Sequence, residues 1–303
     1  MKGSINYQVS QVMKKLTGHG VSKYETRQKS NIKGENNHNV SPLIHSTNYD
    51  KAIKNTALSL AQFSKENGIK DLEKINNKTI EKYINEKIKQ GITNKSISAK
   101  LSHMMKIQHA LNQTFYNRTK KENTLLFTKE KIKELREKAN KIAKKSDKSK
   151  IKSYSNPNIF LSKIAKRSSL QVELMMKTGI RVNDAIHIKK EQLLSNNEIR
   201  FKSKGGKVFI KKIDPFLYEK IKKAVEANSY SIPYKTFYRD MKKVAIENNI
   251  SWSGTHGLRH SWAKKDFSNN LKSGLSNEKS LLKTSQNLAH NRAEITKLYI
   301  QSR

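Results

Sequence analysis

Long helical periods with few breaks are the feature that most limits how this chain can fold. Apolar residues recur at helical spacing through most of it, as at Ile97, Leu101 and Met104, and only 4 Pro and 12 Gly interrupt its 303 residues. Such spacing gathers apolar side chains on one face of a helix. We therefore predict a mostly helical protein, long enough for two domains with a core each.

The chain carries a large excess of positive charge. Its 62 Lys and Arg against 25 Asp and Glu give a formal net charge of +37, which indicates a polyanionic partner such as DNA, RNA or an anionic membrane surface. Only 10 of the basic residues are Arg, and an A/T-rich genome would write the same Lys, Asn and Ile into any protein. The sign of the charge is therefore more informative than its size.

Composition also excludes several classes. The chain has no Cys, so disulfides and thiolate metal sites are excluded. Its first residues lack the apolar core of a secretory signal, and no uninterrupted apolar run reaches the roughly 18 residues of a membrane span. We expect a cytoplasmic protein with no membrane partner.

Breaks in the periodic pattern divide the chain into four parts. Residues 1–45 are predicted to form a leading arm of one short helix and an Asn-rich loop, in which the helix either contacts nucleic acid or simply packs on the rest of the protein. Residues 46–128 are predicted to form a bundle of about four helices. Residues 129–153 are predicted to be a basic linker that begins as a helix, since 129–152 contain 11 Lys or Arg and 4 Asp or Glu. Residues 154–303 are the last domain.

The last domain is predicted to be α+β but mainly helical. It should open with one helix from about Ile159 to Lys177. Apolar and charged residues then alternate on both sides of Lys204-Gly205-Gly206, which is typical of a short β-hairpin. Helices return after it.

Three short motifs in this domain carry polar residues that could act together: residues 178–184 (TGIRVND), 255–260 (THGLRH) and 289–299 (AHNRAEITKLY). Taken singly, each has an ordinary explanation, such as a local Arg181–Asp184 salt bridge or a packed Tyr299. His256 and His260 could share a metal ion. However, Gly257 stands where a metalloprotease helix has Glu, and spacing suggests no third ligand, so no metal is expected.

In this order the motifs resemble the tyrosine recombinase, or phage integrase, family over the whole last domain. The resemblance implies a SAM-like helical core-binding domain at 46–128, followed by a mainly helical catalytic domain with a small hairpin. The catalytic residues that it implies are Arg181, Lys204, His256, Arg259, His290 and Tyr299. Asp184 would support them, and Lys207 is a less favoured alternative to Lys204 as the hairpin lysine.

The resemblance also implies a chemistry. Tyr299 would attack a DNA phosphodiester and form a 3′-phosphotyrosyl link, so neither metal nor nucleotide cofactor is required. Two guanidiniums, on Arg181 and Arg259, can hold the non-bridging oxygens in paired hydrogen bonds. His256 would accept the phenol proton, Lys204 would protonate the departing 5′ oxygen, and His290 would donate to the phosphate.

The implied partner is double-stranded DNA, bound by a homo-tetramer in a prokaryotic, nucleoid-associated setting. We expect the linker to contact the DNA backbone through Lys141, Lys144, Lys145, Lys148 and Lys150. Only four residues follow Tyr299, so a tetramer would have to assemble without a C-terminal helix docked on the neighbouring subunit.

The sequence departs from the family pattern in two places. Ala289 stands where the family usually has Gly, which we expect to be tolerated if the backbone is helical there. The interval between Arg259 and His290 is longer than usual, and we predict an inserted loop at 268–270 and 273–274. Asn291 with Glu294 is typical of a capping box for the helix that carries Tyr299.

Two other functions are compatible with the same residues. One is an enzyme that relaxes supercoiled DNA, like a type IB topoisomerase, through the same tyrosine. The other is a catalytically inactive DNA-binding relative, which the complete set of six residues disfavours.

Overall fold

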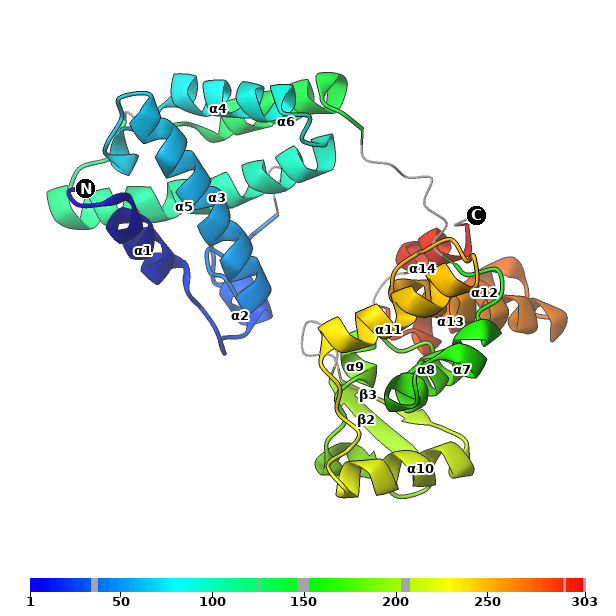
Figure 1. The fold of residues 1–303 in the computed structure, drawn as a ribbon. Helices are drawn as coiled ribbons and strands as arrows, with labels where there is room; N and C mark the ends of the chain where they lie inside the picture. The colour runs from blue at the N-terminus through cyan, green and yellow to red at the C-terminus, as the bar shows by residue number, and fades with distance from the viewer. Residues whose placement is uncertain (34–37, 125, 146–152, 203–207, 291–292, 302–303) are drawn as a thin grey trace. The chain divides into compact units, whose positions relative to one another are not determined.

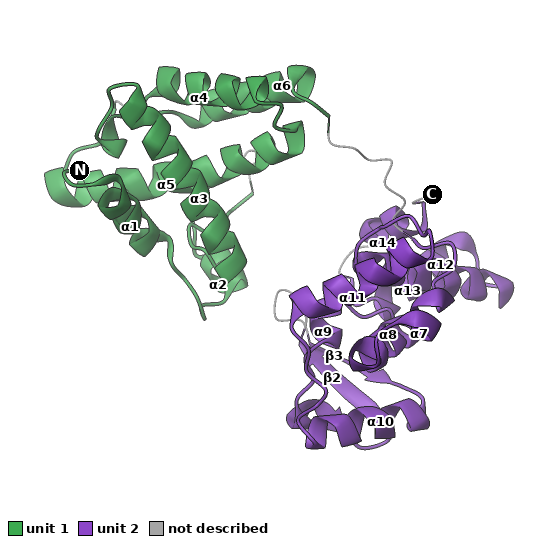
Figure 2. Ribbon diagram, in the orientation of Figure 1, with its two compact units in different colours: residues 1–147 green, residues 148–303 purple. Residues whose placement is uncertain are grey.

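The computed structural model describes residues 1–33, 38–124, 126–145, 153–202, 208–290 and 293–301. The chain divides into two compact units, Met1–Asp147 (unit 1) and Lys148–Arg303 (unit 2) (Figure 2). Each unit has its own cluster of buried apolar residues. The predicted mostly helical fold is confirmed in both.

The regular elements in the described residues of unit 1 are helices (Figure 1), and isolated β-bridges join Thr17 to Ile44 and Lys33 to Asn39. Side-chain caps begin several of its helices; Asn76, for example, accepts from the amide of Thr79 at the start of α4, and such caps satisfy amides that a helix leaves unbonded. The helices are α1 (Ile5–Leu16), α2 (Lys23–Gln28), α3 (Thr47–Glu66), a 3-10 turn η1 (Leu72–Lys74), α4 (Asn77–Lys89), α5 (Asn94–Thr119) and α6 (Lys129–Ile142).

The leading segment and the start of the linker belong to this unit's core. We placed these segments in an arm and a linker outside the bundle, with a packing role for the first helix as the alternative. That alternative is confirmed, because Val12 and Leu16 of α1, like Ile132 and Leu135 of α6, are fully buried in the same cluster as α3 and α5. In the described part of 46–128 the structure has three α-helices and the 3-10 turn η1, where we predicted about four helices. The apolar stripes of α1 and α6 complete the bundle.

A lysine fastens the leading segment to α5. The Nζ atom of Lys106 donates to the carbonyl oxygens of Ser41 and Leu43. Burial, and next the charge of Lys23, lowers the pKa of Lys106 to about 8. Residues 41–43 are therefore held against α5 by a partly desolvated cation.

Unit 2 combines eight helices of its described residues with a small sheet (Figure 1). They are α7 (Asn158–Lys163), α8 (Lys166–Thr178), α9 (Val182–Ala185), α10 (Pro215–Glu226), α11 (Tyr234–Glu247), α12 (His256–Lys272), α13 (Asn277–Asn287) and α14 (Ala293–Ile300), with a 3-10 turn η2 (Lys190–Gln192).

The predicted hairpin is confirmed. Strands β2 (Glu198–Lys202) and β3 (Val208–Lys212) pair antiparallel, with Arg200 opposite Ile210. A strand that we did not predict, β1 (Leu193–Leu194), adds to the free edge of β2. Phe201 faces the core and stacks on Phe209, with ring centroids 5.4 Å apart.

Three local predictions were not confirmed. The single helix expected from Ile159 to Lys177 is broken at Ile164, whose backbone is extended. Residues 268–270 continue α12 instead of forming a loop, and the turn comes at Ser273–Gly274. Asn291 lies outside the described residues, so the predicted capping box does too.

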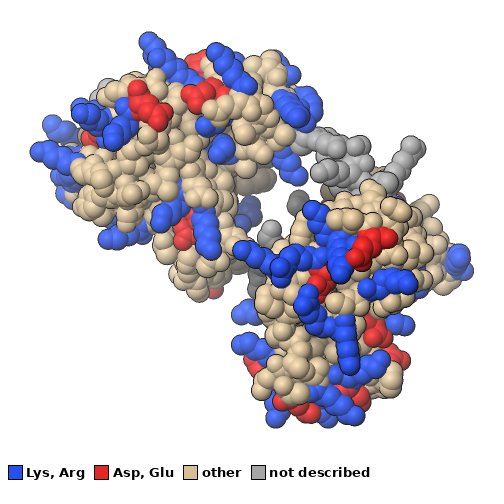
Figure 3. Space-filling model, in the orientation of Figure 1, with Lys and Arg blue, Asp and Glu red and all other residues tan. Residues whose placement is uncertain are grey.

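Basic side chains are spread over both units. The face in Figure 3 shows many Lys and Arg side chains on each unit, with fewer acidic ones among them. Among the helices that the structure describes, none has the length and apolar character needed to cross a membrane.

Candidate active site

The first motif forms a tight helix end that Gly179 makes possible. Gly179 closes α8 in the left-handed region at φ 67°, and a Cβ built on it would lie 2.4 Å from the Trp262 ring of α12. Glycine alone avoids both problems. The chain then turns into α9, with Arg181 half-buried at its N-terminus.

The second motif places Arg259 inside unit 2. Its side chain on α12 is 1% exposed, and its guanidinium donates to the carbonyl oxygens of Gly179 (2.5 Å) and Leu288 (2.7 Å). Burial, followed by the positive charge of Arg181, lowers the pKa of Arg259 to about 10, and Tyr299 and Asp184 act in the opposite direction. Arg259 therefore stays charged at neutral pH.

The third motif begins where α13 ends in a Schellman motif. The amide of Ala289 donates to the carbonyl of Gln286, and the amide of His290 donates to that of Ser285. Ala289 itself has φ 52°, so the backbone there does not meet the condition, a helical conformation, under which we expected alanine to be tolerated. A left-handed alanine costs roughly 1–2 kcal/mol, which explains why glycine suits this position. The motif fixes the point at which the His290 side chain leaves the backbone.

His290 holds Arg259 through one ring nitrogen. Its Nε2 atom lies 3.0 Å from Nη2 of Arg259, and its Nδ1 atom lies 2.7 Å from Oγ1 of Thr296. Because a guanidinium can only donate, Nε2 accepts, and we infer that the neutral ring carries its proton on Nδ1. In this arrangement His290 orients Arg259, whereas we had expected it to donate to a phosphate.

Tyr299 lies beside both residues. Its ring centroid is 5.2 Å from that of His290 and 5.8 Å from the guanidinium carbon of Arg259. The phenol also interacts with Arg259 closely enough to influence the pKa of that residue. The side chain is half-buried on α14. Tyr299 of the third motif therefore lies next to Arg259 of the second motif.

His256 lies close to Arg259 and Arg181. Part of the residue is exposed at the start of α12, and part of its ring is shielded from solvent. Desolvation of its ring, followed by the charges of Arg259 and Arg181, lowers the pKa of His256 below its usual 6.5. At neutral pH its imidazole can therefore accept a proton.

The structure therefore brings the following predicted site residues together in unit 2: Arg181, Asp184, His256, Arg259, His290 and Tyr299. Both hairpin lysines, Lys204 and Lys207, lie outside the described residues, and so do Lys148 and Lys150. Lys141, Lys144 and Lys145 are exposed at the end of α6 and after it, in unit 1.

Sequence reasoning missed two members of this group. His260 stacks on Tyr299 with ring centroids 3.9 Å apart and an angle of 12° between the planes, and Thr296 is fully buried against His290. Both stand inside the motifs quoted above, one turn of helix or less from a chosen residue. Their closeness in sequence to residues already chosen was the signal that could have identified them.

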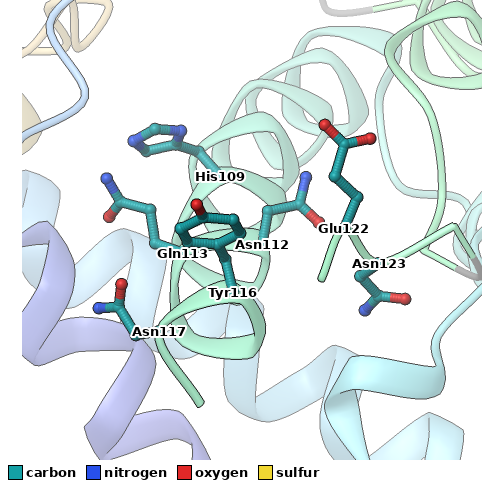
Figure 4. A pocket seen from close by; sticks show the side chains of 7 residues that line it. All are labelled: His109, Asn112, Gln113, Tyr116, Asn117, Glu122 and Asn123. Atoms are coloured by element: carbon teal, nitrogen blue, oxygen red, sulfur yellow. The ribbon is translucent and has the colours of Figure 1, made fainter. Parts of the chain in front are cut away.

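Two cavities lie in unit 1. One of about 550 Å³ opens on the C-terminal half of α5, where His109, Gln113 and Tyr116 project from the helix (Figure 4). A second, of about 610 Å³, lies between α5 and the segment that includes Ile32 and residues 38–42. Among the described residues, no cluster of three or more His, Asp or Glu side chains is arranged to hold a metal ion.

The part of the chain that holds this group of residues matches a known protein family. The model of the phage integrase family matches residues 150–303. No curated protein matches the chain by sequence.

Several solved structures share the fold. The XerH site-specific recombinase bound to difH substrate has 14% identity and a TM-score of 0.60, over 99% of this chain and 94% of that one. A lambda integrase dimer bound to a COC' core site has 16% identity and a TM-score of 0.58, over 85% and 90%. The Tn1549 transposon integrase in complex with transposon right end DNA has 11% identity and a TM-score of 0.51, over 96% and 94%.

Proposed function

The chain belongs to the phage integrase family, and from this membership and the geometry of unit 2 we propose that it is a site-specific DNA recombinase. It would cleave and rejoin double-stranded DNA through a 3′-phosphotyrosyl intermediate on Tyr299. The XerH, lambda and Tn1549 structures named above contain DNA, and a lambda integrase tetramer is bound to a Holliday junction. We extend DNA and the tetramer to this chain as its proposed partner and assembly.

The observation that carries the proposal is the meeting of Tyr299 with Arg259 and, through it, with Arg181. A phosphodiester under attack gains negative charge on its non-bridging oxygens, which two guanidiniums can stabilise. Since both arginines and the phenol come from one chain, a single protomer supplies the nucleophile and its cations.

The proposed steps balance in protons and bonds. The Tyr299 oxygen forms a bond to phosphorus while the bond from phosphorus to the 5′ oxygen breaks. The neutral His256 accepts the phenol proton, and Lys204, assigned from the sequence alone, gives a proton to the 5′ oxygen. Religation reverses each transfer. Asp184 and His290 support the reaction by orienting the arginines.

Trapping on nicked DNA tests this proposal. A library of randomised duplexes, each with a nick that lets the short downstream fragment with its free 5′-hydroxyl escape, should accumulate a covalent complex visible on a denaturing gel. Mass spectrometry should then locate the nucleotide on Tyr299. Tyr299→Phe should trap nothing, whereas Tyr234→Phe, at an exposed tyrosine of α11, should trap as the native chain does.

Two results would overturn the proposal: no covalent complex with the native chain, or equal trapping by Tyr299→Phe. Relaxation of a supercoiled plasmid without recombinant joints would assign the same tyrosine to a topoisomerase-like enzyme instead. DNA binding without either product would identify an inactive relative.

A further inference from the structure

Helix α14, which carries Tyr299, has few apolar anchors. Of its eight residues Ala293–Ile300, only Thr296 is buried, and Leu298 is 60% exposed. Burial of apolar side chains is the main force that holds a helix on a protein. Its position must therefore depend on a small number of specific contacts.

Besides the approach of Tyr299 to Arg259 and His290 described above, two contacts fix α14 on the rest of unit 2. One is the hydrogen bond between Thr296 and the His290 ring, described above. The other is the stack of the Tyr299 ring on the imidazole of His260, nearly parallel at 12° and with centroids 3.9 Å apart. A hydrogen bond fixes one point of the helix, and a parallel stack fixes the plane of the phenol ring.

His260 is itself held firmly. It is 7% exposed on α12, and α12 is tied to its neighbours on either side of it. Trp262 donates to the carbonyl of Lys177 at the end of α8, and the Asp266 carboxylate accepts from Thr284 and Asn287 of α13. The imidazole therefore offers Tyr299 a surface with little freedom of its own.

We propose that His260 is a positioning residue, which holds the Tyr299 ring by stacking and so keeps α14 beside Arg259. This inference rests on the proposed function, because it assigns His260 a part in presenting the nucleophile. The flat face of the imidazole performs this task, and its nitrogen atoms are not required for it.

The expected effect is modest and measurable. Stacked aromatic pairs contribute about 0.5–1.5 kcal/mol beyond buried area, which corresponds to about two- to tenfold in the population of the ordered state. His260→Ala should therefore slow single-turnover cleavage at saturating nicked DNA by about two- to tenfold. The affinity for DNA should not change, since His260 lies under Tyr299 and is buried.

Three variants separate the stack from other roles. His260→Leu fills similar space without a flat ring and should be as slow as His260→Ala, whereas His260→Phe should restore most of the rate. Val244→Ala truncates a buried side chain of α11 in the same unit and serves as the control for lost stability. Should His260→Ala fail to fold, the Leu and Phe variants carry the same comparison.

A signal that needs no DNA keeps this test separate from the proposed function. With 3-fluorotyrosine at position 299, the ring current of the imidazole should shift the 19F resonance upfield. The shift should disappear in the Ala and Leu variants and persist with Phe. An unchanged resonance in His260→Ala overturns the proposal, as does a Phe variant as slow as Ala or an equal loss of rate in Val244→Ala. Absence of cleavage by the native chain would instead refute the recombinase assignment.

Discussion

Units 1 and 2 each hold a desolvated cation with the same kind of contact, although Lys106 is only half-buried and Arg259 is fully buried. In unit 1, Lys106 donates to the carbonyl oxygens of Ser41 and Leu43. In unit 2, Arg259 donates to those of Gly179 and Leu288. Burial lowers the pKa in both cases, to about 8 and about 10.

The two cations differ in what surrounds them. The charge that acts on Lys106 is another cation, Lys23, and the result is a segment fastened to a helix. Around Arg259 a second guanidinium, a carboxylate and a phenol converge. A desolvated cation by itself therefore contributes to the fold, and it becomes a candidate site only where a second cation and a nucleophile meet it.

The largest effect on the cleavage rate is expected from a change at Arg259. Arg259→Lys keeps the charge but loses the planar fork, so single-turnover cleavage of nicked DNA should fall by roughly a hundredfold or more. Lys106→Met, which removes the corresponding cation of unit 1, should leave that rate unchanged at saturating DNA. Equal losses in the two variants would show that the two cations do not differ in role.

A second test compares two left-handed glycines. Gly91 of unit 1 has φ 73° and open space where a Cβ would be, so Gly91→Ala should cost about 1 kcal/mol. Gly179→Ala meets the Trp262 ring as well and should cost about 3 kcal/mol. Urea unfolding of each variant measures both values. Similar costs would mean that Trp262 moves aside without penalty.

The smallest expected effect concerns two histidines. Positive neighbours contribute to a lowered pKa at His256 in unit 2 and at His109 in unit 1, where Lys106 is the first charge after desolvation. Loss of a nearby positive charge makes protonation easier, so Arg181→Gln should raise the pKa of His256, and Lys106→Gln that of His109, each by about one unit or less. NMR titration of the free protein follows both.

The same lowered pKa predicts how cleavage depends on pH. His256 accepts a proton only when neutral, so the rate should be full near pH 7 and fall as the pH drops below 6.5 through the lowered pKa. A rate that began to fall above pH 7 would argue against His256 as the base.

Periodicity predicted the helices and alternation predicted the hairpin, because both patterns follow from local geometry. The features that depend on tertiary packing could not be predicted from these local patterns. Residues 1–45 were assigned to a separate arm, although α1 contributes Val12 and Leu16 to the core of unit 1, and no local signal shows which core an amphipathic helix joins. The break at Ile164 carries neither Gly nor Pro.

The candidate site shows the same division. Residue types and their order were enough to select Arg181, Arg259 and Tyr299. The left-handed Ala289 was not anticipated, since alanine gives no warning of positive φ. The stack of His260 on Tyr299 joins positions 39 residues apart (299 minus 260), so only the folded chain reveals it.

The contacts of Arg259 also set an order of events during folding. Its two carbonyl partners lie 80 residues before it and 29 residues after it in the chain, and contacts that close long loops form late. A nascent chain therefore has no assembled cation site until α8, α12 and the end of α13 have met. Because those three segments hold Arg259, a variant that loosens any one of them should also disturb the contact between Arg259 and Tyr299.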